Sequence, residues 1–183
     1  MKKIIFLLLI LMNSSGNAQQ VTGFSKSAGD YAVMLGQLDS LLVNSHFIKT
    51  VHFGGKPRTI FVPWIRDHVH VMKAMKYLHS DMKSFLEFFL ENQTGEGIIF
   101  DYYFPLNIRG ISLRKKLFEP RYWKEFPEDS IEMHRLPVEA DLEYLMVEGV
   151  YAVYQSTGDL DFVRKWMPAL VKGMNYMMTD PLR

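Results

Sequence analysis

The chain of 183 residues contains no cysteine, and this absence constrains its fold more than any other single feature. The N-terminus has the pattern of an exported protein, and small exported proteins commonly depend on disulfides for stability. Without disulfides, the fold must be stabilised by an ordinary buried core of apolar side chains. Apolar residues make up 48% of the chain and aromatic residues 14%, so the side chains for such a core are present.

The first 18 residues have the order of a secretory signal peptide. Lys2 and Lys3 precede an apolar run over residues 4–12, and small or polar residues follow as far as Ala18. This run is much shorter than the roughly 20 residues that span a bilayer, so it predicts export and not a membrane anchor. We place the cleavage after Ala18, with Gly16 as the second small residue. The mature protein is then expected to be periplasmic or secreted, and no cysteine follows that could carry a lipid.

The charges of the chain favour an uncharged partner. The formal net charge is +1, from 21 Lys and Arg against 20 Asp and Glu, and the basic residues are scattered along the sequence. Nucleic acids and membrane surfaces attract proteins through clustered basic side chains, so neither is expected as a partner once the signal is removed. Aromatic rings fill cores, and they also form flat platforms on which sugars stack.

The spacing of apolar residues predicts a mainly helical protein. Five segments are expected to be helical: residues 30–43, a segment that follows residues 63–67 and reaches about His79, and residues 82–92, 137–155 and 160–178. Pro168 is expected to kink the last of these or to begin a helical turn of its own. Pro137 is expected to start the fourth helix, and Asp81 and Asp159 are expected to cap the third and the fifth. Residues 46–62 and 98–104 are expected to be extended or looped. Residues 109–132 lack any period, which predicts a long surface loop of the kind that often carries function.

Three short motifs resemble a known superfamily. Trp64-Ile65-Arg66-Asp67 is similar to the segment that opens the sugar pocket of the six-hairpin (α/α)6-barrel glycoside hydrolases, the relatives of glucoamylases and trehalases. Residues 97–103 (GIIFDYY) resemble the Gly-rich turn and the aromatic pocket residues of these enzymes. Residues 155–159 (QSTGD), followed by residues 166–170 (WMPAL), resemble the helical hairpins of the same superfamily. The order of the three motifs along the chain also agrees.

This resemblance implies a mainly α fold of antiparallel helical hairpins forming part of an (α/α)6 barrel, with a few short extended segments. A complete barrel has twelve helices, which need on the order of 200 residues at typical lengths, and the spacing above predicts five. Residues 19–183 are therefore expected to be the N-terminal part of such a domain. The implied activity is hydrolysis of O-glycosyl bonds at oligosaccharide or glycan ends, with inversion, and this chain would supply the sugar-binding half.

The resemblance places sugar-binding residues in two of these motifs. Arg66 and Asp67 would grip hydroxyl groups of the terminal sugar, since a carboxylate beside a guanidinium stays ionised and accepts two hydrogen bonds. Trp64 would stack on a sugar face, and Asp101 with Tyr102 would line the pocket. Each residue also has a structural interpretation: Asp67 as a helix cap, Trp64 as a core ring, and Asp101 as an ordinary turn residue.

A second group of charged residues precedes and begins the predicted helix 137–155. Glu139 and Glu143 are expected on one helical face, with Asp141 pointing elsewhere. Inverting hydrolysis needs a carboxylic acid and a carboxylate roughly 6.5–9.5 Å apart, so Glu139 and Asp141 are the candidate catalytic groups, although in the resembling enzymes the main acid usually lies on a later hairpin. Arg135 is expected to contact sugar. The structural interpretation is that these acids stabilise the N-terminus of a helix.

No motif in the sequence indicates a cofactor or a metal. His68 and His70 are two residues apart, and in a helix such residues do not share a face. The patterns of zinc proteases, P-loops, dinucleotide-binding folds and serine hydrolases do not occur in the sequence. Two alternatives to a hydrolase stay open: a non-catalytic helical glycan-binding protein of the cell envelope, and an inactive fragment.

Overall fold

The computed structural model describes residues 28–44, 48–106 and 119–179. The chain divides into two units between Met34 and Leu35, within the first described helix. Of the first unit, only the start of that helix is described, so the following account concerns the second unit. The predicted signal peptide, residues 1–18, lies outside the described residues.

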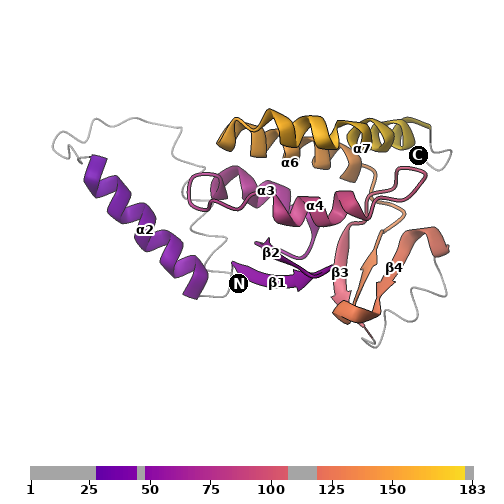
Figure 1. Cartoon of the computed structure of the whole chain (residues 1–183), viewed down its shortest axis with the longest axis horizontal. Helices are drawn as coiled ribbons and strands as arrows, with labels where there is room; N and C mark the ends of the chain where they lie inside the picture. The colour runs from indigo at the N-terminus through magenta and orange to yellow at the C-terminus, as the bar shows by residue number, and fades with distance from the viewer. Residues whose placement is uncertain (1–27, 45–47, 107–118, 180–183) are drawn as a thin grey trace. The chain divides into compact units, whose positions relative to one another are not determined.

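Along the described chain, α2 is followed by two strands, two helices, three strands and two further helices (Figure 1). The α-helices are α2 (Ala28–Asn44), α3 (Ile65–Met75), α4 (Ser84–Glu91), α6 (Leu142–Thr157) and α7 (Leu160–Thr179). The strands are β1 (Lys49–Phe53), β2 (Lys56–Ile60), β3 (Tyr102–Pro105), β4 (Trp123–Phe126) and β5 (Ile131–His134). Two 3-10 turns, η1 (Pro120–Tyr122) and η2 (Pro127–Asp129), flank β4.

The predicted fold class is wrong. The described residues form a mixed α/β structure with two small antiparallel sheets, and not a set of helical hairpins from an (α/α)6 barrel. One sheet pairs β1 with β2, and the other has the order β3-β5-β4. The error came mainly from residues 109–132, for which we predicted a loop. Residues 123–126 of that stretch form β4, and β5 starts at Ile131 and pairs with both of its neighbours.

The β1-β2 hairpin turns at two glycines. Gly54 and Gly55 have φ angles of +59° and +69°, a backbone conformation that glycine adopts without steric cost and that a two-residue hairpin turn requires. The hairpin packs on α4 through Arg58, which is buried. Its guanidinium donates to the Ser84 carbonyl at 2.9 Å and to the Glu91 carboxylate at 2.6 Å, which ties strand to helix.

The core of the second unit lies between two pairs of helices. Figure 1 shows α6 and α7 side by side along one edge, with α3 and α4 next to them. Gly149 lets α6 approach closely, because a Cβ atom at this position would lie only 3.0 Å from Leu86 and 3.2 Å from Val69. The fully buried residues at this contact are apolar and come from three helices: Ile65, Val69, Met72, Leu86, Phe89, Leu142, Met146 and Val153.

Several predicted helix boundaries differ from the observed ones. The helix predicted from Pro137 begins only at Leu142, because residues 137–138 form a turn and the first helical hydrogen bond runs from the Leu145 N–H to the Asp141 carbonyl at 2.9 Å. The end of α6 is as expected, since Gly158 has a left-handed φ of +68°. Asp159 accepts from the Phe162 N–H at 2.9 Å and caps α7.

No helix among the described residues is long and apolar enough to cross a membrane.

Candidate functional site

The predicted site residues from α3 and from the segment before α6 lie together. We define the Arg66 cluster as Arg66, Asp67, Asp101, Glu139 and Asp141. Backbone hydrogen bonds fix its frame: the Ile65 N–H donates to the Asp101 carbonyl at 2.7 Å, and the Asp101 N–H donates to the His134 carbonyl at 2.7 Å. The first turn of α3 is thereby attached to the start of the three-stranded sheet.

Arg66 is held by two carboxylates of the segment before α6. Its Nη2 lies 2.6 Å from the Oδ1 atom of Asp141 and also forms an ion pair with Glu139. The side chains of Arg66, Glu139 and Asp141 are 36%, 24% and 46% exposed, so solvent and ligands reach all three. Bonds between a guanidinium and carboxylates are charge-assisted and directional, and they keep these groups oriented at the surface.

Asp101 is the buried member of the cluster. Asp101 is 1% exposed, and its Oδ2 atom accepts no hydrogen bond within the described part of the chain. Burial raises the pKa of Asp101 to about 6, although the charges of Arg135 and Arg66 act in the opposite direction. Asp67 and Asp141 raise this pKa further by like-charge repulsion. A carboxyl group with such a pKa beside exposed acids is a common feature of functional sites.

Aromatic rings lie next to the Arg66 cluster. Trp64 pairs with Tyr102 by an isolated β-bridge, and their ring centroids are 4.1 Å apart. Phe104 lies edge-on to both rings. Tyr102 is fully buried, whereas Trp64 is partly exposed. Trp64 is therefore the ring of this group that a ligand in solution can reach.

Arg135 lies below the surface and supports the segment that carries Glu139. It is fully buried and pairs with the buried Glu143 at 3.0 Å. Arg135 Nη1 also donates to the Ile99 carbonyl at 2.8 Å, and Nη2 donates to the Glu139 carbonyl at 2.5 Å. The predicted sugar contact of Arg135 does not fit this burial, and its position is that of a structural residue beneath the site.

The structure thus groups most, but not all, of the predicted residues. Arg66, Asp67, Asp101, Glu139 and Asp141 converge, with Trp64 and Tyr102 beside them. The expectation that Glu139 and Glu143 share a helical face is wrong, because residue 139 precedes the helix. Glu143 instead contacts Arg135, while Glu139 and Asp141 both reach Arg66.

Sequence reasoning overlooked a second polar pair on the three-stranded sheet. His134 Nε2 lies 3.2 Å from Glu132 Oε1, and both side chains are 1% exposed. His134 also stacks on the Tyr102 ring, with centroids 5.7 Å apart. The sequence does contain a pattern that could have located this pair. In residues 131–134, apolar Ile131 and Met133 alternate with Glu132 and His134, and such a period of two indicates a strand.

The two histidines considered for a metal site do not form one. His68 is buried, and its Nδ1 accepts a hydrogen bond from the Phe61 N–H at 3.3 Å. Desolvation lowers the pKa of His68 to about 3, so the ring stays neutral. His70 is exposed. Within the described residues, no group of three or more His, Asp or Glu side chains is placed to hold a metal ion.

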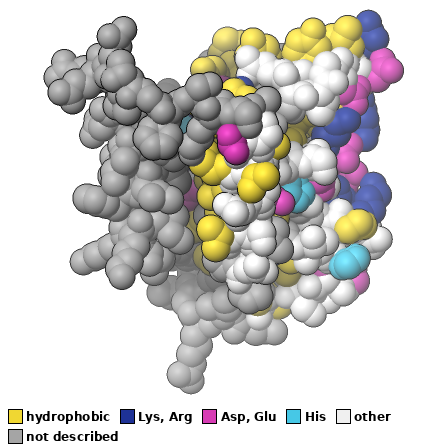
Figure 2. Space-filling view, turned by 90° about the vertical axis from the view of Figure 1, so that its left-hand side faces the viewer, with side chains coloured by type: hydrophobic (Ala, Val, Ile, Leu, Met, Phe, Trp, Pro, Cys, Tyr) yellow, Lys and Arg dark blue, Asp and Glu magenta, His cyan; other side chains and the backbone are white. Residues whose placement is uncertain are grey.

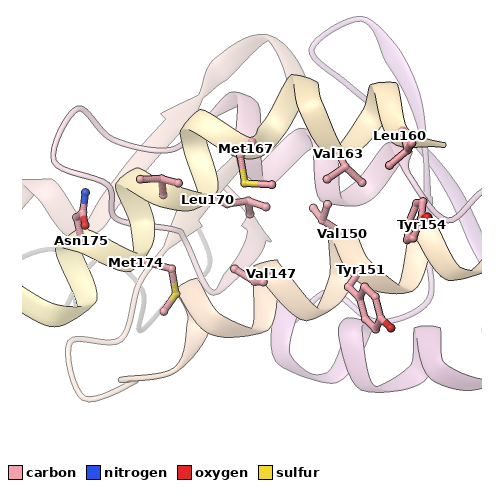
Figure 3. Close-up of a pocket in the computed structure, with 11 residues that line it drawn as sticks. Val147, Val150, Tyr151, Tyr154, Leu160, Val163, Met167, Leu170, Met174 and Asn175 are labelled. Carbon is pink, nitrogen blue, oxygen red and sulfur yellow. The ribbon is translucent and has the colours of Figure 1, made fainter. Parts of the chain in front are cut away.

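An apolar groove of about 490 Å³ lies between α6 and α7, and its lining contains no residue of the Arg66 cluster (Figure 3). Side chains of the two helices face each other across it, including Val150, Tyr154, Val163 and Met167. The lining contains no carboxylate and no basic side chain, and its polar side chains are those of Tyr151, Tyr154 and Asn175.

The face of the molecule seen in Figure 2 carries charges of both signs. Lys and Arg side chains alternate with Asp and Glu along one edge of its described part.

Compared with known proteins, the chain matches no protein-family model, no curated protein and no solved structure.

Proposed function

We propose that the Arg66 cluster binds the terminal unit of a carbohydrate, and that the protein acts on O-glycosyl bonds as a glycoside hydrolase. One observation carries the proposal: Arg66 is held between Glu139 and Asp141 at the surface, with the exposed Asp67 on the same helical turn and the Trp64 ring close by.

This combination of groups suits a sugar. Hydroxyl groups both donate and accept hydrogen bonds, and the carboxylates and the guanidinium of the cluster supply acceptors and donors within one small area. The apolar face of a sugar ring packs on an aromatic ring, a role for which Trp64 is available. The Trp64 ring packs on the buried ring of Tyr102, which holds it in position.

Hydrolysis requires carboxyl groups that differ in proton affinity. Burial raises the pKa of Asp101 to about 6, whereas Glu139 and Asp141 both pair with Arg66. Glu139 and Asp141 are the candidates for activating water in this proposal. We further propose that the protein works in the periplasm or outside the cell, which the pattern of residues 1–18 supports.

Binding of simple sugars tests the carbohydrate part of the proposal. Neutral methyl glycosides of several configurations would be titrated into the full chain and followed by NMR or calorimetry. Arg66→Met is expected to weaken binding at least tenfold. The substitution removes the guanidinium, which supplies hydrogen-bond donors and holds Glu139 and Asp141 in place. Arg164→Met is the matched control: Arg164 pairs with Asp161 at 2.9 Å, and both side chains are exposed. Equal loss in both variants, or no binding by the wild type, would contradict the proposal.

A non-catalytic glycan-binding protein is the second candidate. It is favoured by the pairing of both Glu139 and Asp141 with Arg66, since both carboxylates are then engaged by the guanidinium, whereas hydrolysis needs a carboxyl group that can give its proton to the leaving oxygen. Release of the aglycone from aryl glycosides distinguishes the two candidates. Hydrolysis that is lost in Asp141→Asn supports the enzyme, whereas sugar binding without any hydrolysis supports the binding protein.

A further inference from the structure

We infer that the Arg66 cluster selects sugars that carry a protonated amine, so that amino sugars are its preferred ligand class. This inference rests on the proposed carbohydrate function and specifies which carbohydrates the site takes.

Charge is unbalanced among the described residues of the site. There, four acids, Asp67, Asp101, Glu139 and Asp141, lie near the surface guanidinium of Arg66. The other nearby guanidinium, Arg135, is already paired with the buried Glu143. Negative charge therefore exceeds positive charge in the cluster, and a ligand with an ammonium group reduces this excess while a ligand with a carboxylate or sulfate increases it.

Asp101 carries a buried oxygen that lacks a donor. Its side chain is almost fully buried, and its Oδ2 atom accepts no hydrogen bond within the described residues. A buried oxygen without a donor costs free energy relative to one that has a partner. The charged groups that act on Asp101 are Arg135 after β5, Arg66 and Asp67 from α3, and Asp141 before α6. A cation bound beside Asp67 and Asp141 would offset the like-charge repulsion that these two acids exert on Asp101.

Two of the acids are accessible. Asp67 is exposed, and the Asp141 side chain is 46% exposed. In this inference, the ammonium group of a sugar approaches these two carboxylates from solvent. The ammonium donates three hydrogen bonds, so it can contact both carboxylates while the ring of the sugar lies toward Trp64.

The pKa of Asp101 adds a pH dependence to the inference. Burial, with Asp67 and Asp141, raises this pKa to about 6, so the group loses its charge as the pH falls through that value. The attraction for an ammonium group then decreases. The preference for amino sugars is therefore expected to be strong at pH 7 and weaker at pH 5, whereas the affinity for a neutral sugar changes less.

Matched methyl glycosides test the inference with the full chain. The set consists of a 2-amino sugar, its N-acetylated form, the neutral 2-hydroxy sugar and the corresponding uronic acid, each in the gluco and galacto configurations. The amino sugar is expected to bind about tenfold more tightly than the neutral sugar at pH 7 and low salt, and this ratio is expected to fall in 0.5 M salt because the attraction is screened. The uronic acid is expected to bind most weakly.

Variants show whether the preference arises in the cluster. Asp67→Asn and Asp101→Asn are expected to reduce the ratio of amino-sugar to neutral-sugar affinity at least threefold. Asp161→Asn is the control, because Asp161 is an exposed acid that pairs with Arg164, and this substitution is expected to leave the ratio unchanged.

The outcomes separate this inference from the proposed function. Tighter binding of a neutral or an acidic sugar overturns the inference but leaves the carbohydrate function in place. An amino-sugar preference that persists in both Asp67→Asn and Asp101→Asn also overturns it. If no sugar of any class binds to a chain whose folding is verified by a cooperative unfolding transition, the inference and the proposed function both fail.

Discussion

Arg135 and Glu143 form a buried ion pair beneath the Arg66 cluster. Arg135 Nη1 lies 3.0 Å from Glu143 Oε1, Nη2 lies 3.2 Å from Oε2, and both side chains are fully buried. The pair links the end of β5 to the first turn of α6. It also fixes the backbone of Glu139 and Ile99, which Arg135 contacts through their carbonyl oxygens.

Loss of one member of this pair is expected to destabilise the fold strongly. Glu143→Gln removes the carboxylate that pairs with the buried Arg135 guanidinium, and breaking a buried ion pair in this way typically costs about 3–5 kcal/mol of unfolding free energy. Urea denaturation at pH 7 measures this quantity. The double variant Arg135→Met, Glu143→Leu is expected to recover much of the loss, because it removes both charges together. A double variant as unstable as Glu143→Gln would contradict this account.

The Asp101→Asn substitution is expected to change how stability depends on pH. The folded protein holds the pKa of Asp101 at about 6, above its ordinary value of 3.8. Between these two values the folded state binds more protons than the unfolded state, so this group lowers stability as the pH rises from about 4 to 6. Denaturation at pH 4.5 and pH 8 is therefore expected to show that the variant gains stability relative to the wild type at the higher pH, by about 1–3 kcal/mol. If the difference in unfolding free energy between the variant and the wild type is the same at both pH values, the raised pKa of Asp101 is contradicted.

His68 is expected to have the opposite influence. Burial lowers its pKa from 6.5 to about 3 in the folded protein. Between these values the unfolded state binds more protons, so the contribution of His68 to stability is complete above pH 6.5 and is lost as the pH falls toward 3. His68→Leu, which keeps an apolar side chain between Phe61 and Phe85, is expected to remove this acid sensitivity. Unfolding free energies at pH 4.5 and 7.5 measure it, and an unchanged pH dependence would show that the ring titrates normally.

Gly97 is expected to tolerate no side chain. Its φ angle is +110°, and a Cβ atom would lie 2.5 Å from the Lys172 carbonyl oxygen, which belongs to the backbone of α7. Gly97→Ala would separate the loop before β3 from α7, with an expected cost of about 2–4 kcal/mol of unfolding free energy. Gly158→Ala is the control, since it has φ of +68° with open space around it, and its cost is expected to be about 1 kcal/mol. Equal costs would mean that the clash at Gly97 is relieved.

Local signals in the sequence predicted the helices well. Apolar side chains at helical spacing placed α2, α3, α4 and α7 close to their observed positions, because this spacing depends only on which face of a helix is buried. Gly158 and Asp159 also act at the end of α6 and the start of α7 as expected. Such caps are formed between residues a few positions apart, so they can be identified without knowledge of the rest of the fold.

The residue types of the site can be read from the sequence: an Arg-Asp pair after a tryptophan, an acid before two tyrosines, and further acids after Pro137. Which of these residues meet depends on how distant segments of the chain pack together. The strands β4 and β5 are four residues each, and so short a strand is specified mainly by the neighbours with which it pairs. That pairing, which attaches Asp101 to β5 and brings Asp141 to Arg66 across 75 residues of chain, depends on contacts between distant segments, and no local pattern of residues encodes it.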